Sequence, residues 1–143
     1  MSYDFKLKDG DIAILSTGEP GFVRDDAKLI QDILKMLFTP TGESTVHPWY
    51  GTPLLSRAVG NSFDTEILAT EIQTAVQYGL NNILTLQQLQ QQDNQFMTPR
   101  EQISKIQDIR AELDPTDQRK LVVTVEIISK SNDLVTESII VAV

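Results

Sequence analysis

The hydrophobic period of the chain changes once, and this change limits the folds that the sequence can adopt. In the first part of the chain, apolar residues recur at the three- and four-residue spacing of amphipathic helices. In the C-terminal third they alternate with polar residues, as they do in half-buried strands. Helices followed by strands predict an α+β domain, in which the helices pack on one face of a sheet.

Two helices are expected in the first part. The first begins after a cap at Asp25 or Asp26 and ends before Pro40 and Gly42. Its predicted buried face consists of Ile30, Ile33, Leu34 and Leu37. The second begins after a cap at Asp64 or Thr65 and continues into a glutamine-rich stretch, which is either low-complexity sequence or, as we favour, an exposed helix end. Its predicted buried stripe consists of Leu68, Ile72, Ala75, Gly79 and Ile83. Glycine weakens a helix by about 1 kcal/mol relative to alanine, so Gly79 predicts a closely packed backbone.

The strands are expected in "QDIRAEL", "LVVTVEII" and "LVTESIIVAV", which short polar turns join into an antiparallel meander. The predicted fold is therefore α+β, with two main helices on a three-stranded, mostly antiparallel C-terminal sheet and an extended N-terminal arm. A chain of 143 residues fits a single domain. Its parts would be an arm over 1–24, helices and a connecting loop over 25–92, and the meander over 99–143.

Composition argues against several classes of function. A net charge of −8 disfavours nucleic acid and an anionic membrane as partners. The chain has no cysteine and a single histidine, His47, too few ligands for a zinc site, so no cofactor or metal is expected. A hydrolytic triad would have to use His47, which lies in a loop before Pro48 and is interpreted as a surface or loop-packing residue. No signal peptide or membrane-spanning run is recognised, and the chain is not expected to be an enzyme.

The loop "TVHPWYGTPL" gathers rare residues and is interpreted as a rigid connector. Pro48 and Pro53 restrict the backbone, and Gly51 permits a positive φ in a tight turn. Trp49 and Tyr50 carry large apolar surfaces. They either cap the core of the domain or anchor a partner, because tryptophan and tyrosine are enriched at the centres of interfaces.

The order of these features resembles that of the baseplate wedge proteins of contractile-tailed bacteriophages, the GPW family, which also occurs in type VI secretion baseplates and contractile bacteriocins. The resemblance covers roughly residues 11–143. Gly42–Glu43 and "YGTPL" at residues 50–54 match the first family motif. The second motif is a Glu-Pro-Arg tripeptide, and the matching positions read Thr98, Pro99 and Arg100. Glu101 is the candidate to replace the missing glutamate.

The resemblance implies a structural protein of the virion that is assembled in the host cytoplasm. Its implied partners are other baseplate wedge proteins, the tail sheath protein, and tube or hub proteins. The family seeds the sheath, whose strands add to its C-terminal sheet. Some members were once labelled lysozymes, so a peptidoglycan hydrolase remains the alternative, together with a regulatory adaptor of the same fold.

Eight residues are candidates for partner binding. Pro99 and Arg100 would contact other wedge subunits, although Arg100 could instead be a solvated surface residue or an internal brace between helix and sheet. Trp49, Tyr50 and Gly51 form the loop candidate. The last strand contributes Ile139, Ile140 and Val141. After Glu137 this strand has no proline and no charged residue that would protect its edge from pairing with another chain.

Overall fold

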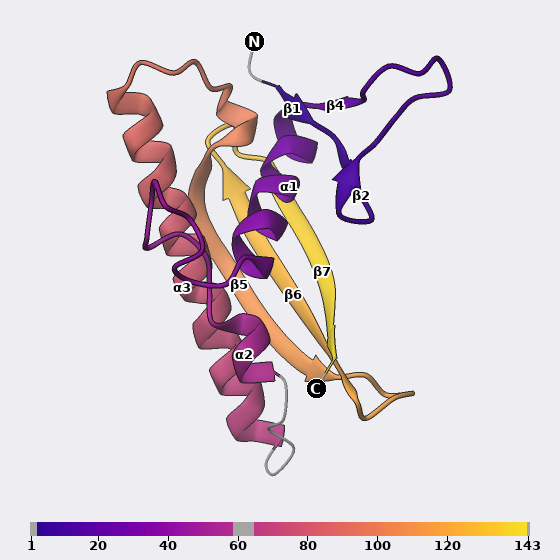
Figure 1. Ribbon diagram of the computed structural model, residues 1–143. Helices are drawn as coiled ribbons and strands as arrows, with labels where there is room; N and C mark the ends of the chain where they lie inside the picture. Colours follow the sequence, from indigo (N-terminus) through magenta and orange to yellow (C-terminus); the bar gives the residue numbers. More distant parts are fainter. Residues whose placement is uncertain (1–2, 59–64, 143) are drawn as a thin grey trace.

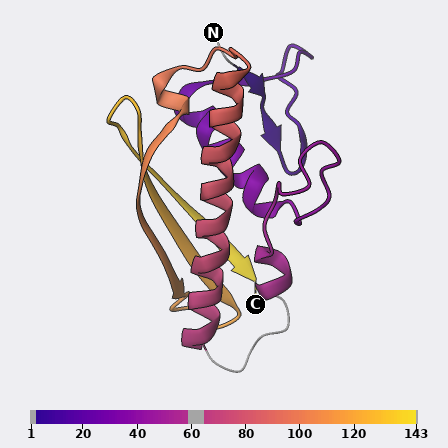
Figure 2. The same cartoon turned by 90° about the vertical axis from the view of Figure 1, so that its left-hand side faces the viewer.

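The computed structural model describes residues 3–58 and 65–142 and confirms the α+β fold (Figure 1). The antiparallel sheet has the order β5-β6-β7, formed by Ile103–Leu113, Lys120–Ser129 and Leu134–Ala142. Two helices, α1 (Asp25–Phe38) and α3 (Thr65–Gln92), cover one face of this sheet. Seen from the side, the sheet, the helices and the N-terminal segments follow one another as layers (Figure 2).

The core lies between the sheet and the two long helices. The inner face of β6 buries every second residue, as the period-two pattern predicts: Leu121, Val123, Val125 and Ile127. The predicted stripe of α3 is confirmed, since Leu68, Ile72, Ala75 and Ile83 are all buried. The glutamine-rich stretch continues α3 to Gln92, as expected.

The predicted buried face of α1 was partly wrong. Ile33 and Leu37 are fully buried, but Leu29 and Met36 accompany them. Ile30 and Leu34 lie at the flank and are only partly buried. The helix carries apolar residues on a stripe wider than its contact, and the position of α3 and the sheet decides which of them are covered.

The predicted cap of α1 was also wrong. Arg24 occupies the N-cap position with an extended backbone and makes no side-chain cap, while Asp25 and Asp26 lie in the first turn. Their carboxylates accept hydrogen bonds from a distant segment, as described below. The cap expected at Asp64 lies outside the described residues, and α3 begins at Thr65.

Gly79 is required for close packing, but its neighbours are side chains. A Cβ at this position would lie 2.7 Å from Thr52 Cγ2 and 2.8 Å from Leu37 Cδ2. The expectation of a neighbouring backbone was therefore wrong, although the expectation of a close contact was correct.

Three short features differ from the main elements that the sequence predicts. The arm over 1–24 is not simply extended, because β1 (Asp4–Phe5) pairs with β4 (Phe22–Val23) and β2 (Leu7–Lys8) pairs with β3 (Asp11–Ile12). A short helix, α2 (Leu54–Ala58), follows the connecting loop. A 3₁₀ turn, η1 (Pro99–Glu101), precedes β5 at the start of the region assigned to the β-meander.

Candidate partner-binding surfaces

The turn η1 and the residue before it are attached to the start of α1. Thr98 Oγ1 donates to Asp25 Oδ1 over 2.7 Å, and Arg100 Nη2 donates to Asp26 Oδ2 over 2.8 Å. Asp25 has a positive φ of 51°, a conformation that aspartate tolerates better than most residues. The tripeptide Thr98–Arg100 thus ties the entrance of the sheet to the first turn of a helix that lies far away in the sequence.

Arg100 also approaches the turn between β6 and β7, where its Nε lies 3.8 Å from Asp133 Oδ2. The hydrogen bond from Arg100 to Asp26 and the charge of that carboxylate raise the pKa of the guanidinium. The side chain nevertheless remains 52% exposed. The structure therefore gives Arg100 the geometry of an internal brace and leaves much of its surface accessible.

Glu101, the candidate to replace the charge of the missing glutamate, lies in the interior of the domain, and its replacement of that charge stays a prediction. Its side chain is 1% exposed, and neither carboxylate oxygen has a hydrogen-bond partner among the described residues. Its carbonyl accepts from Gln87 Nε2 over 2.9 Å, and Gln87 Oε1 accepts from the Ile103 N–H over 2.9 Å. Gln87 was missed, although it continues the predicted stripe of α3 four residues beyond Ile83.

The connecting loop has the tight turn that its glycine predicts. Gly51 has a φ of 103°, and a Cβ there would lie 2.5 Å from the Thr39 carbonyl oxygen. Asn82 of α3 donates to the carbonyls of Trp49 and Gly51 over 3.0 and 3.3 Å. No signal in the sequence distinguished Asn82 from the neighbouring polar residues, so its role in holding the loop was missed.

Trp49 and Tyr50 are partly buried and pack against the core. The rings of His47 and Trp49 lie 5.1 Å apart, which makes His47 part of the loop packing. Burial raises the pKa of Tyr50. The loop residues therefore contribute to the domain itself and keep a partly exposed surface.

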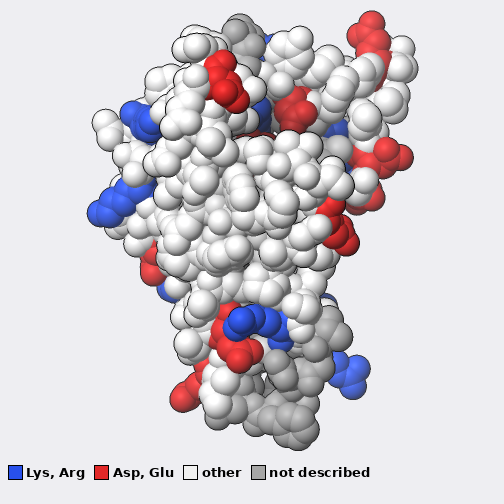
Figure 3. All heavy atoms as spheres, turned by 60° about the vertical axis from the view of Figure 1, so that its left-hand side comes forward, with Lys and Arg blue, Asp and Glu red and all other residues white. Residues whose placement is uncertain are grey.

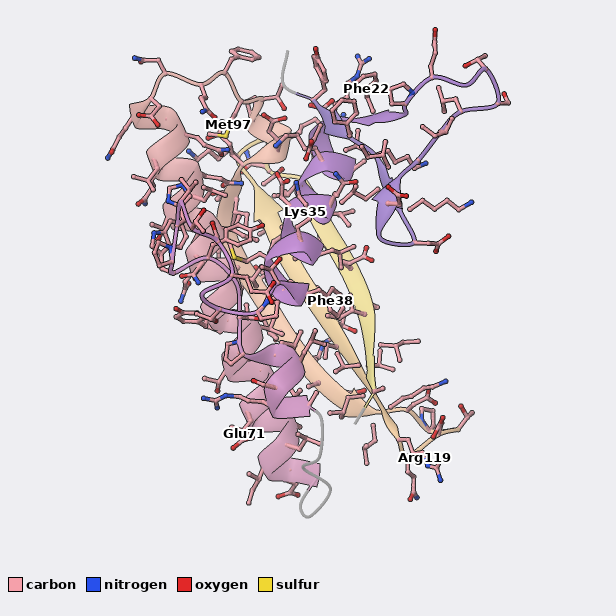
Figure 4. The ribbon with its side chains drawn as sticks, in the orientation of Figure 1. Phe22, Lys35, Phe38, Glu71, Met97 and Arg119 are labelled. Carbon is pink, nitrogen blue, oxygen red and sulfur yellow. The ribbon has the colours of Figure 1, made fainter. Side chains whose placement is uncertain are left out.

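A polar hollow of about 300 Å³ lies beside Tyr50, between the arm and the two long helices. Lys35 Nζ bonds Asp4 Oδ2 over 2.6 Å and lies 3.2 Å from Asp32 Oδ1. Lys28 pairs with Asp32 over 2.8 Å. Figure 4 shows Lys35 on α1, below the arm that carries Phe22.

These contacts hold the arm, so we name Asp4, Gln31 and Lys35 the arm latch. The Gln31 side chain accepts from the Leu7 N–H and donates to the Phe5 carbonyl, each over 2.8 Å. Burial raises the pKa of Asp4, but the hydrogen bond and charge of Lys35 outweigh it, and the net pKa is lowered. For Lys35, burial lowers the pKa, but Asp4 and Asp32 outweigh it, and the net pKa is raised. Both groups are thus stabilised in their charged forms.

The strand β7 lies at the edge of the sheet, and its one strand partner among the described residues is β6. Ile139 and Val141 point inward and are buried, whereas Ile140 points outward and is 60% exposed. Val143, which the sequence places in the same strand, lies outside the described residues.

The eight candidates do not converge on one site. Arg100 lies beside Asp133, at the beginning of β7, and Ile140 lies near the opposite end of that strand. The loop of Trp49 is bonded to the middle of α3. In the described part of the chain, no three acidic or histidine side chains gather as a metal site would require.

No model of a known protein family matches the chain, and no curated protein matches it. Among solved structures, the fold is similar to that of a Geobacter sulfurreducens protein provisionally described as a tail lysozyme. The TM-score is 0.57 at 18% sequence identity, and the match covers 80% of this chain and 87% of that one. At this identity the likeness concerns the fold. No helix in the described part of the chain has the length and apolar character needed to cross a bilayer.

Proposed function

We propose that the protein is a structural component of a contractile tail, placed in the baseplate wedge, where it starts the sheath by accepting a sheath strand on β7. The observation that carries this proposal is the open and regular edge of β7. The fold shared with a protein described as belonging to a tail supports a place in a tail. The assignment to the wedge rests on the motifs around Gly51 and Pro99.

The two edges of the sheet differ in how well they suit strand addition. Along β5 the register with β6 shifts twice, between Ile103 and Lys105 and between Ile106 and Asp108. Such irregularities, together with charged side chains, protect an edge from further pairing. The register of β7 with β6 runs without a shift from Leu134 to Ala142. We therefore assign strand addition to β7.

The register also indicates which backbone groups of β7 are available. The Ser129 N–H donates to the Asp133 carbonyl, so these residues form a hydrogen-bonded pair at the turn. Bonded and non-bonded pairs alternate along antiparallel strands, so the odd-numbered residues of β7 bond β6. The even-numbered residues, including Ser138 and Ile140, direct their N–H and C=O groups away from β6. An incoming strand would bond these groups.

A hydrolytic function receives less support from the polar hollow. A glycosidase requires one carboxyl group that stays protonated to act as the acid. Asp4 has a lowered pKa, and Asp32 bonds both Lys28 and Lys35. Asp4 is therefore held in its ionised form and does not suit the role of that acid. We therefore propose a non-catalytic role, with neighbouring wedge proteins, the sheath protein, and tube or hub proteins as partners.

The proposal is tested by Ile140→Pro, which removes an outward N–H donor at a position where the ladder to β6 does not use it. Ile140→Thr is the matched control, because it removes the apolar side chain and keeps the N–H. We expect tails with Ile140→Pro to lack sheath and tails with Ile140→Thr to carry sheath of normal length. Sheath of normal length and frequency on Ile140→Pro tails would refute the proposal.

A further inference from the structure

The exposed face of α3 carries no charge over most of its length. From Ile72 to Gln92 the helix has no acidic or basic residue, although the chain has 20 acidic and 12 basic residues. Its exposed ridge, at helical spacing, consists of Thr70, Thr74, Gln77, Asn81, Thr85, Gln88 and Gln92. At 1.5 Å per residue, this uncharged ridge is about 33 Å long. Figure 3 turns this side toward the viewer, and charged residues surround an uncharged centre.

Several polar groups of the uncharged ridge are already bonded within α3. The hydroxyls of Thr70, Thr74 and Thr85 donate to carbonyls four residues earlier. Gln77 Nε2 donates to Asn81 Oδ1 over 3.2 Å. A polar group that keeps its hydrogen bond when water leaves is less costly to bury. The ridge is thus polar in composition and yet suited to burial.

Two hollows lie along the uncharged ridge and meet at Thr74. One lies between α3 and β5 and is lined by Gln73, Gln77 and Ile106. The other lies on the opposite side, lined by Pro53 and Tyr78. Each hollow has one charged lining residue, Asp108 in the first and Arg57 in the second. A ridge with a groove on each side is the relief against which another helix packs.

We propose that the uncharged ridge of α3 is a docking surface for a helix of another tail protein, which meets it with amide, hydroxyl and small apolar side chains. A charge placed on the crest of this ridge is disfavoured, because none of the seven ridge residues carries a counter-charge. An uncharged partner helix is also not repelled by the net charge of −8 that this protein carries. The inference rests on the proposed place in a tail and concerns a surface different from the β7 edge.

The test places a charge of either sign in the centre of the ridge. Gln77 is exposed, so Gln77→Lys and Gln77→Glu are expected to fold, which melting curves verify. Each variant is supplied to cells that make the tail without the native protein, and its amount in purified tail particles is measured. We expect both signs to lower incorporation by about tenfold or more, because either charge is buried unpaired.

Matched controls come from Gln118, an exposed glutamine in the turn between β5 and β6. Its neighbour Arg119 lies in the β5–β6 turn, which projects at the lower right of Figure 4. Gln118→Lys and Gln118→Glu should be incorporated normally. Disruption by one sign only would indicate a charged partner and overturn the inference, as would normal incorporation of both Gln77 variants.

The protein that docks on the ridge is identified with a photo-cross-linking residue that replaces Thr85 in assembled particles. The expected product joins α3 to a helical, uncharged segment of another tail protein. A product that joins two copies of this chain, or none at all, would overturn the inference. If the native protein is absent from tail particles, the proposed function itself fails. This result differs from a cross-link between two copies and from the absence of a cross-link, which overturn only the docking surface.

Discussion

The guanidinium of Arg100 donates to the carboxylate of Asp26, which lies 74 positions earlier in the chain, over 2.8 Å. With the neighbouring bond between Thr98 and Asp25, this contact links the entrance of the sheet to the first turn of α1. Residues Thr98–Arg100 therefore connect two distant parts of the domain.

Replacing Arg100 with alanine should leave the monomer folded and lower its melting temperature slightly, because the lost ion pair is solvent-exposed. Asp26→Ala should have a similar effect. The variant with both substitutions should be no less stable than the less stable of the two single variants, because either change alone already removes the ion pair. Melting curves of the four proteins at low and high salt measure this coupling. Effects that simply add would show that the two side chains do not stabilise one another. If the guanidinium also contacts a wedge subunit, Arg100→Ala should in addition reduce baseplate assembly.

Gly51→Ala should destabilise the domain more than Gly42→Ala does. Both glycines have a positive φ, which costs an alanine about 1–2 kcal/mol. Only at Gly51 would the new Cβ meet backbone, 2.5 Å from the Thr39 oxygen and 2.7 Å from the Pro40 oxygen. Because backbone cannot move aside cheaply, we expect an additional loss of about 1–3 kcal/mol at Gly51. Urea denaturation measures both, and equal losses would contradict the close turn.

Trp49→Ala should lower the free energy of unfolding by about 2–3 kcal/mol, less than the loss for a fully buried aromatic residue. The ring packs on the core but remains partly exposed. Val46→Ala, in the same loop and 78% exposed, is the control and should change stability by less than about 0.5 kcal/mol. An equally small change for Trp49→Ala would mean that the ring serves a partner alone.

The arm latch should depend on pH at both extremes. The folded pKa of Asp4 is lowered, so its contribution is complete above 3.8 and is lost as the pH falls through the lowered value. The folded pKa of Lys35 is raised, so its contribution is complete below 10.5 and is lost as the pH rises through the raised value. Between these limits the latch should hold the arm closed.

Asp4→Asn should weaken the latch at neutral pH and accelerate hydrogen exchange of the Leu7 amide, which bonds Gln31. Asp9→Asn, at the tip of the β2–β3 hairpin, is the control and should leave that exchange unchanged. Protection of Leu7 that is identical in both variants would show that the apolar contacts of the arm suffice.

The periodic elements could be predicted because each depends on its own residues. The alternation of Leu121, Val123, Val125 and Ile127 determines which face of β6 is buried, whichever strand lies beside it. The stripe of α3 and the positive φ of Gly51 are similarly local. Because these features are local, they predict an α+β fold without knowledge of the tertiary contacts.

The remaining features depend on residues that are distant in sequence. Asp26 is recognisable as an acid in a first helical turn, but its pairing with Arg100 requires the two segments to meet. The sequence does not distinguish the roles of individual glutamines. Gln87 bonds the segment that leads into β5, whereas Gln31 bonds the N-terminal arm. Whether Ile30 or Leu29 is buried depends on how α1 is rotated and positioned against α3 and the sheet. The helical period of the sequence does not determine this orientation.

Hydrogen exchange along β7 tests the central claim most directly. In the isolated protein, the amides of Val135, Ile139 and Val141 should be protected by β6, while those of Ser138 and Ile140 exchange rapidly. In sheathed tail particles the account predicts that Ser138 and Ile140 also become protected, because an added strand accepts their hydrogen bonds. Rapid exchange of these two amides in sheathed particles would contradict strand addition at β7.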